Sequence, residues 1–360
     1  MTGSADTAPD EGHRPRAVVA VPARLRQAFF APEVWRRLAR AAEPAVLEAH
    51  DDRAALARAL AAGGGARVLV TAWGAPLVDG ALLAAAPRLE LIAHTGGAIS
   101  PYITREVFDR GVLVTQAGAA MAPPVAEVSL TFTLNLLHRV HRFDHALRTG
   151  ADWAAATAMP PQHEIRGCPV GVIGASRTGR AYIPLARALG AEVTVFDPCL
   201  GEEEAGRLGV RTAPLDELLR TSRIVAVHAP ALPETRHLLG ARELALMPDG
   251  AGLVNTARSW LVDESALLAE VRTGRIDAAL DVFDQEPLPV DHPFRSLGNV
   301  LLTPHRAAAT AEGHRALGES TVAEVERFLG GTPLLHAVGP AALARVEQPT
   351  ARAMPSRIPE

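Results

Sequence analysis

The sequence predicts an α/β protein with two doubly wound domains, each a parallel sheet between two layers of helices. Short apolar runs alternate with helical patterns along the chain, which is typical of parallel sheets covered on both faces. The chain has 360 residues, of which 48% are hydrophobic, whereas a single core stops growing at roughly 250–300 residues. These observations predict two cores rather than one.

The first series of elements starts at residue 17. Pro32 lies in the first turn of a predicted helix, 32–42, where its missing N–H is not needed. Asp51 and Asp52 can cap a helix that runs to Ala62 and ends at a run of glycines. Further helices are predicted near 79–86 and 104–110. The strands predicted in this series are 17–21, 67–72, 89–93 and 112–115.

A long helix, at about 124–147, separates this series from a second one. The last predicted helix covers about 309–329. Residues 1–16 are predicted to be a disordered tail because they lack an apolar core and carry acids, and the Pro- and Arg-rich residues 338–360 a mobile tail. The strands predicted in the second series are 170–173, 192–196, 224–227, 252–255, 278–282 and 300–302.

Composition excludes several classes of function. The net charge of −4 and the pI of about 6.4 leave no basic stripe for nucleic acid. All 36 basic residues are arginine, which excludes lysine chemistry such as Schiff bases. Two cysteines, Cys168 and Cys199, form no disulfide framework, and neither a signal peptide nor a membrane-spanning run is visible. We therefore expect a cytoplasmic protein that binds neither nucleic acid nor membrane.

The stretch VGVIGASRTGR, residues 170–180, has the pattern of a phosphate-binding turn between a strand and a helix. Gly174 would let the chain leave the strand sharply, and Gly179 would let the helix pack closely. Ser176 occupies the middle position, where glycine is usual. Serine disfavours a positive φ, so the turn could be reshaped there. Arg177 would face an anionic pyrophosphate, together with the helix N-terminus. Alone, this turn is a weak indication of function.

Asp197 strengthens the indication, because it ends the next strand in the segment EVTVFDP. An acid at this place accepts hydrogen bonds from the ribose hydroxyls of a dinucleotide and repels a 2′-phosphate, which favours NAD over NADP. The alternative is that Asp197 only caps the turn before Pro198.

Four downstream segments, together with the Gly174 turn, resemble the NAD-dependent D-2-hydroxyacid dehydrogenase family in order and spacing. The resemblance is to phosphoglycerate dehydrogenase-like members and covers about residues 17–337. It implies a Rossmann NAD-binding domain inserted in a flavodoxin-like substrate domain. The four segments are VAVHAPALPETRHLL (225–239), LVNTARSWLVDESAL (253–267), ALDVFDQEPLP (279–289) and LLTPHRAA (301–308).

Under this resemblance, the substrate domain comprises residues 17–117 and 306–337, and the NAD-binding domain comprises 118–305. The chain then crosses between the domains twice, which makes a hinge, and NAD and substrate would lie in the cleft. The resemblance also implies a homodimer formed through the NAD-binding domains and the helix near 125–147.

Reduction of a 2-oxo acid needs a cation for the carboxylate and carbonyl, a hydride donor and a proton donor. Arg258 offers a planar guanidinium that can hold two oxygens. His305 can give the proton, since imidazole titrates near neutral pH. Glu286 would orient the imidazole and favour its protonated form. The resemblance makes these three the catalytic residues. Each alone could instead be a surface charge, a turn or a loop residue.

The remaining site residues are carried over from the family motifs. The backbone of HTGGAIS would hold the substrate carboxylate with Gly96, Gly97 and Ala98, beside Arg258. The predicted cofactor-binding residues are Gly174, Ser176, Arg177, Thr178, Gly179, Asp197, His228, Pro230, Thr256, Ala257 and Asp281.

Two departures from the family pattern concern the substrate. Ser259 and Trp260 stand where small, glycine-like residues are common, and Trp260 adds bulk close after Arg258. A separate pattern, His138, His141 and His145, has a spacing on one helix that could bind zinc. No cysteine or HExxH motif accompanies it, so we expect no metal and interpret the three as a polar stripe.

We expect an enzyme that interconverts a 2-oxo acid and a D-2-hydroxy acid with NAD(H). One alternative is an NAD(H)-sensing binding protein on the same fold, like the C-terminal-binding-protein corepressors. Another is an NADP-dependent glyoxylate or hydroxypyruvate reductase, against which Asp197 speaks. The side chain of the substrate cannot be named from the sequence.

Overall fold

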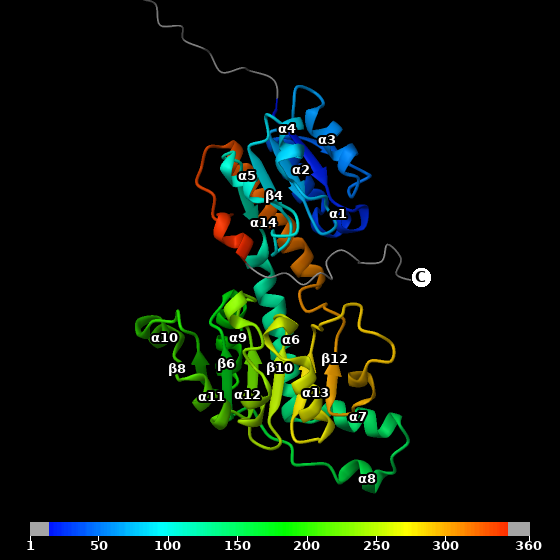
Figure 1. Cartoon of the computed structure of the whole chain (residues 1–360), viewed down its shortest axis with the longest axis vertical. Helices are drawn as coiled ribbons and strands as arrows, with labels where there is room; N and C mark the ends of the chain where they lie inside the picture. The colour runs from blue at the N-terminus through cyan, green and yellow to red at the C-terminus, as the bar shows by residue number, and fades with distance from the viewer. Residues whose placement is uncertain (1–13, 345–360) are drawn as a thin grey trace, which may run out of the picture. The chain divides into compact units, whose positions relative to one another are not determined.

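The computed structural model describes residues 14–344, which divide into two compact units (Figure 1). Unit 1 extends to Gly118 and resumes at Arg315–Leu343, and unit 2 comprises Ala119–His314. The chain thus passes between the units inside two helices, α6 (Gly118–Leu137) and α14 (Ala311–Leu329). The functional domain limits expected from the sequence, at 117/118 and 305/306, stay a prediction.

Unit 1 contains a six-stranded sheet in the order β13-β5-β4-β3-β1-β2. Strands β2-β1-β3-β4-β5 are parallel and follow the flavodoxin-like order, while β13 pairs antiparallel with β5. The strands are β1 (Arg16–Ala20), β2 (Glu43–Val46), β3 (Val68–Thr71), β4 (Leu91–His94), β5 (Leu113–Gln116) and β13 (Ala337–Val338).

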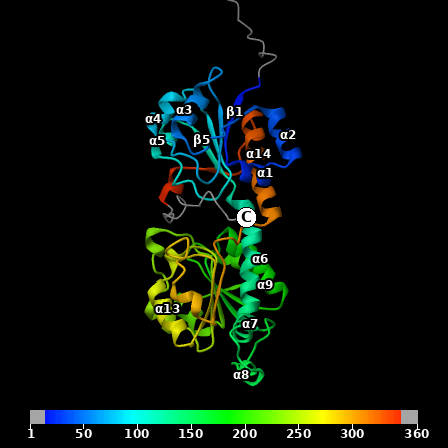
Figure 2. The same cartoon turned by 90° about the vertical axis from the view of Figure 1, so that its right-hand side faces the viewer.

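Helices cover both faces of this sheet (Figure 2). On one face, α3 (Arg53–Ala61), α4 (Gly80–Ala85) and α5 (Arg105–Asp109) bury leucines and valines against the strands. Helices α1 (Ala23–Phe29), α2 (Pro32–Ala41) and α14 lie on the other face. Asp52 caps α3, as the sequence predicts, because its Oδ1 accepts hydrogen bonds from the N–H groups of residues 54 and 55.

Unit 2 contains a seven-stranded parallel sheet in the order β12-β11-β10-β9-β6-β7-β8. Strand order reverses beside β6, which is the doubly wound Rossmann arrangement, and ligands bind at the carboxyl ends of the strands at such a point. The strands are β6 (Pro169–Ile173), β7 (Glu192–Phe196), β8 (Arg211–Thr212), β9 (Ile224–Val227), β10 (Gly252–Asn255), β11 (Asp277–Leu280) and β12 (Val300–Leu302).

Two hydrophobic cores lie on the two faces of this sheet. Helices α6, α9 (Arg177–Ala188) and α10 (Glu202–Leu208) pack on one face. Helices α11 (Leu215–Thr221), α12 (Ala241–Ala245) and α13 (Glu264–Arg272) pack on the other. The fold class predicted from the sequence, a Rossmann domain inserted in a flavodoxin-like domain, is confirmed. No helix in the described part of the chain is long and apolar enough to cross a bilayer.

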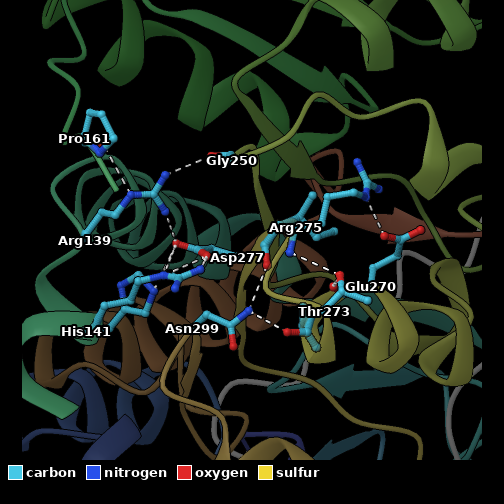
Figure 3. Close-up of polar contacts among 12 residues, drawn as sticks. Arg139, His141, Pro161, Gly250, Glu270, Thr273, Arg275, Asp277 and Asn299 are labelled. Carbon is cyan, nitrogen blue, oxygen red and sulfur yellow. Dashed lines mark hydrogen bonds and ion pairs between the residues drawn. The ribbon is translucent and has the colours of Figure 1, made fainter. Parts of the chain in front are cut away.

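The single long helix predicted at 124–147 is wrong. Helix α6 ends at Leu137, and α7 (Val140–Arg148) starts after Arg139, which has a left-handed backbone with φ 53°. The Arg139 guanidinium reaches the buried carboxylate of Asp277, 2.5 Å away, and the carbonyl oxygens of Pro161 and Gly250 (Figure 3). A contact distant in the sequence therefore accompanies the break.

Both predicted tails are too long. Arg16 already pairs in β1, and residues 1–13 lie outside the described residues. At the other end, Val338 pairs with Val114 in β13, and a 3₁₀ turn covers Pro340–Ala344. Residues 345–360 lie outside the described part of the chain. The sequence also missed β2 and β8, which are short strands with few buried side chains.

Candidate active site

Five predicted site residues directly follow five parallel strands of unit 2. Gly174 follows β6, Asp197 follows β7, His228 follows β9, Thr256 follows β10 and Asp281 follows β11. The carboxyl ends of parallel strands lie at one edge of a sheet, so these residues gather at a single edge of unit 2.

The turn after β6 needs two of its glycines. Gly174 has φ +96°, and a Cβ there would lie 2.5 Å from the backbone of Ala229. A Cβ on Gly179 would lie 2.1 Å from the Gly174 carbonyl oxygen. Ser176 has φ −66° and caps α9, accepting a hydrogen bond from the Gly179 N–H at 3.4 Å. Its backbone therefore does not require glycine, and the expected reshaping of the turn stays a prediction.

The acid after β7 lies beside this turn. Oδ2 of Asp197 accepts a hydrogen bond from the Ala175 N–H at 2.7 Å, and Oδ1 accepts one from the Cys199 N–H at 2.8 Å. Asp197 thus caps its own turn and also contacts the glycine turn. Arg177 and Thr178 begin α9, with Arg177 exposed. A glycine cradle, a helix N-terminus and an acid at the next strand fit the pyrophosphate and ribose of a dinucleotide.

The next two loops provide buried support. His228 is 3% exposed, burial lowers its pKa to about 3, and its ring packs on Tyr182 with centroids 5.0 Å apart. The Thr256 hydroxyl is buried and lies 2.7 Å from Ser129 Oγ of α6. The Ala257 N–H donates to Asn255 Oδ1 at 3.0 Å, and the exposed Pro230 accepts from Thr235 at its carbonyl oxygen.

The predicted acid–base pair is formed. His305 Nδ1 lies 2.7 Å from Glu286 Oε2, and the other carboxylate oxygen accepts the Phe283 N–H at 3.0 Å. The His305 side chain is 42% exposed, but that of Glu286 only 14%. Burial raises the pKa of Glu286, but the His305 hydrogen bond and charge, the Phe283 N–H and the Arg258 charge together bring it below its usual value. The carboxylate is therefore ionised at neutral pH.

Arg258 completes the group. It follows β10 in extended conformation, with φ −149°, and its Nη1 donates to the Ala257 carbonyl at 2.7 Å. Its charge is among the causes that lower the pKa of Glu286. The three predicted catalytic residues thus come from the loops after β10, β11 and β12 and gather in unit 2.

Asp281 organises the loop that carries His305. Its Oδ1 accepts hydrogen bonds from Thr303 Oγ1 at 2.5 Å and from the Arg306 N–H at 2.8 Å, and its Oδ2 accepts the Ala307 N–H at 2.9 Å. His305 itself has a left-handed backbone, with φ 51°. A non-glycine residue in that region is strained. Hydrogen bonds on both sides of His305 hold it there.

The chain is similar to proteins of one known family. Residues 130–307 match the family described as D-isomer specific 2-hydroxyacid dehydrogenase, NAD binding domain. The chain is 36% identical over 240 residues to a glyoxylate reductase from Aeropyrum pernix. The aligned region covers 65% of this chain and 72% of that relative. The chain belongs to the D-isomer-specific 2-hydroxyacid dehydrogenase family.

Other relatives agree. The dehydrogenase is 32% identical over 262 residues to a D-3-phosphoglycerate dehydrogenase from Archaeoglobus fulgidus, over 72% of this chain but only 49% of that protein. The chain thus spans about half the length of that relative. A crystal structure of a phosphoglycerate oxidoreductase from Rhizobium etli is 28% identical, with a TM-score of 0.72 over 93% of this chain and 99% of the other. The predicted family, the NAD cofactor and oxidation of a CH–OH group are confirmed.

Sequence reasoning missed a set of contacts that join the loops of Arg258 and Glu286. Ser259 Oγ donates to Asp284 Oδ1 at 2.7 Å, which links the residue after Arg258 to the loop of Glu286. The Asp284 N–H donates to Glu264 at 3.0 Å. The family pattern offered no indication of this, because Ser259 replaces a small, glycine-like residue.

Trp260 contacts the loop at 232–236. Its indole N–H donates to the Leu232 carbonyl at 2.8 Å, and the Arg236 guanidinium lies 5.2 Å from its ring centroid. The bulk of Trp260 therefore packs on the loop at 232–236, where it holds the segment that follows His228 and Pro230.

The predicted carboxylate-binding loop lies in unit 1, after β4. Gly96 lies against a buried histidine, since a Cβ at Gly96 would be 2.6 Å from His94 Nε2. His94 is 2% exposed, its Nδ1 lies 3.0 Å from Thr71 Oγ1, and its ring stacks on Tyr102. Burial lowers the pKa of His94 to about 3, so the ring is neutral. Gly97 and Ala98 continue this loop.

The three histidines near α7 do not converge. His141 lies 3.5 Å from Asp277, whereas the ring of His145 packs on Gly298, and the backbone break at Arg139 separates both from His138. Within residues 14–344, no group of three His, Cys, Asp or Glu side chains is placed to hold a metal ion.

Proposed function

We propose that Arg258, His305 and Glu286 perform the reaction of this dehydrogenase, the interconversion of a 2-oxo acid and a D-2-hydroxy acid. The observation that carries the proposal is the 2.7 Å contact between His305 Nδ1 and Glu286 Oε2 beside the Arg258 charge. An ionised carboxylate next to an imidazole favours the protonated ring, which is the form that can give a proton.

In the direction of reduction, Arg258 holds the carboxylate and carbonyl oxygens of the oxo acid with its planar fork and draws electron density toward the carbonyl oxygen. NADH, held by the Gly174 turn and Asp197, would supply the hydride for the carbonyl carbon. His305 gives its proton to the oxygen that becomes the hydroxyl. Glu286 keeps the ring in one orientation and stabilises its positive charge. In the reverse direction, neutral His305 takes the hydroxyl proton.

Two further groups complete the proposed site. We assign the backbone N–H groups of Gly96, Gly97 and Ala98 to the substrate carboxylate. We assign Asp197 to the ribose hydroxyls, with a preference for NAD. Its position beside the glycine turn supports this assignment, because a 2′-phosphate there would meet a negative charge.

The test is loss of NADH absorbance with a panel of 2-oxo acids that includes glyoxylate and hydroxypyruvate. We expect turnover with at least one of them, and only slow turnover with NADPH. Asp197→Ala should narrow the difference in turnover rate between NADH and NADPH. Tight NADH binding without turnover of any acid would favour the NAD(H)-sensing alternative, and faster turnover with NADPH would overturn the role of Asp197.

We also propose that the protein is a cytoplasmic homodimer formed through the region of α6, α7 and α8 (Trp153–Thr157). Three large apolar side chains there are exposed: Val140 at 51%, Leu147 at 49% and Trp153 at 76%. Exposed apolar groups in one region are typical of an interface. Sedimentation of the wild type and of Trp153→Arg tests this, with a monomeric wild type as the contrary result.

A further inference from the structure

A cavity of about 270 Å³ opens at the other edge of the unit 2 sheet. It lies where β6 and β9 begin, whereas the catalytic residues follow the carboxyl ends of the strands. The family motifs of the site do not include it. Its lining residues are His163, Glu164, Arg166, Gly167, Cys168, Pro169 and Arg223.

The walls of the cavity are held by backbone hydrogen bonds. The Gly167 N–H donates to the Gly190 carbonyl at 2.8 Å, and the Arg223 N–H donates to the Pro169 carbonyl at 2.9 Å. The segment that leads into the cavity is held by Arg139, whose Nε donates to the Pro161 carbonyl at 3.2 Å (Figure 3). The cavity is therefore formed before any ligand arrives.

Two guanidinium groups of this cavity have no partner among the residues that the structure describes. Some other arginines of unit 2 pair with acids, as Arg180 does with Glu204 and Arg211 with Glu217. Within residues 14–344, neither Arg166 nor Arg223 has a side-chain hydrogen bond or an ion pair. The stem of Arg166 packs on Gly190, where a Cβ would lie 3.4 Å from its Cγ, and Glu164, the one acid in the lining, is exposed.

The other two polar side chains indicate binding rather than catalysis. Burial raises the pKa of the Cys168 thiol to about 11, even though the Arg223 charge opposes this, so the thiol is not a nucleophile at neutral pH. Burial, and then the charges of Arg223 and Arg139, lower the pKa of His163. The cavity thus has a positive field and a neutral imidazole.

We propose that this cavity binds a phosphate group, either inorganic phosphate or that of a small phosphomonoester, between the guanidinium groups of Arg166 and Arg223. Arginine matches phosphate oxygens in both geometry and charge. A bound dianion would reverse the field at His163 and favour its protonated form. Binding therefore takes up a proton, and affinity rises as the pH falls from alkaline values toward the titration range of imidazole.

Calorimetric titration with inorganic phosphate tests the site. We expect Arg223→Gln and Arg166→Gln to weaken binding at least tenfold, and Arg207→Gln, an exposed residue of α10, to leave it unchanged. All four proteins keep Arg258, so phosphate bound at the active site cancels in the comparison. Equal affinity in all four overturns the proposal. Thermal unfolding without phosphate shows whether each variant is folded.

The proton linkage has its own test with sulfate, which does not titrate near neutral pH. Affinity for sulfate should rise as the pH falls from 8 to 6 in the wild type and stay flat in His163→Gln. A flat wild-type profile overturns the role of His163. Glycerol phosphate is titrated in parallel, and whichever of it and inorganic phosphate binds more tightly indicates the class of ligand. If neither binds, the proposed site is contradicted. NADH oxidation is measured on the same variants, so failure here is distinct from failure of the proposed reaction.

Discussion

Asp277 and Asp281 stand at the two ends of strand β11, and each is 1% exposed, but they have opposite surroundings. Asp277 faces the guanidinium groups of Arg139 and Arg142 and the ring of His141 (Figure 3). Asp281 accepts hydrogen bonds from one hydroxyl and two backbone N–H groups. Burial raises the pKa of both carboxyls. The ring of His141 and the two guanidinium groups bring that of Asp277 below its usual value, whereas that of Asp281 stays raised.

This difference separates a carboxylate held by cations from one held by neutral donors. At the amino end of β11, both guanidinium groups are occupied by one buried carboxylate, so the cluster joins α6 and α7 to the sheet. At the carboxyl end, Asp281 holds its loop with neutral donors. On the neighbouring loop, Glu286 contacts the ring of His305, which we propose as the proton donor.

The largest expected effect is on stability. Asp277→Asn leaves Arg139 and Arg142 without a buried counter-charge, and loss of one partner of a buried pair costs about 3–5 kcal/mol. Asp144→Asn removes an exposed pair with Arg148 and should cost under ~1 kcal/mol. Urea unfolding measures both. Equal losses would show that the Asp277 cluster is not structural.

The wild type and Asp277→Asn should also differ in how their stability depends on pH. The folded pKa of Asp277 is lowered, so its contribution is present above the ordinary value of 3.8 and is lost as pH falls through the folded pKa. The wild type should lose more free energy of unfolding than Asp277→Asn between pH 5 and pH 3. If the free energy of unfolding fell equally with pH in both proteins, the lowered pKa of Asp277 would be contradicted.

The next effect is on catalysis. Arg258→Lys should lower kcat/KM, with a rise in activation free energy of about 2–4 kcal/mol, because a point charge cannot replace the planar fork. Arg272→Lys, an exposed substitution on α13, is the control. Near wild-type kinetics in Arg258→Lys would remove this residue from the proposed site.

Asp281→Asn tests the other end of β11. The amide replaces one acceptor oxygen with a donor, so one of the three hydrogen bonds around His305 becomes a donor–donor contact. We therefore expect kcat to fall, with a rise in activation free energy of about 1–3 kcal/mol. The dissociation constant for NADH separates loosening of the loop from loss of the cofactor contact that the sequence predicts for Asp281. Asp291→Asn, an exposed substitution in the same loop, serves as the control.

The smallest effect is a displacement of the pH profile. Reduction should slow as pH rises, because the imidazolium loses its proton. In Glu286→Gln the ring loses the neighbouring negative charge, so the pH of half-maximal rate should move lower. Glu203→Gln, on the exposed face of α10, should leave the profile in place. An unmoved profile in Glu286→Gln would mean that the carboxylate does not act on the proton donor.

Much of the fold was predictable because it depends on local patterns. The strands of unit 2 form short runs rich in apolar and β-branched residues, and β6, β7, β9 and β10 begin and end within a residue of their predicted bounds. Strand β2 escaped detection because its side chains are only partly buried and it contains Pro44. The break at Arg139 also escaped, since its partner Asp277 is far away in the sequence.

The identities of Arg258, Glu286 and His305 were accessible from motifs, because each lies just after a strand and such ends meet at one edge. Order along the chain thus implied the family and the reaction type. Folding alone revealed which groups Asp281, Asp197 and Ser259 bind, that Trp260 packs on the loop at 232–236, and that two arginines share a cavity at the opposite edge. Those outcomes depend on hydrogen bonds and burial between residues distant in the chain, and no local pattern encodes them.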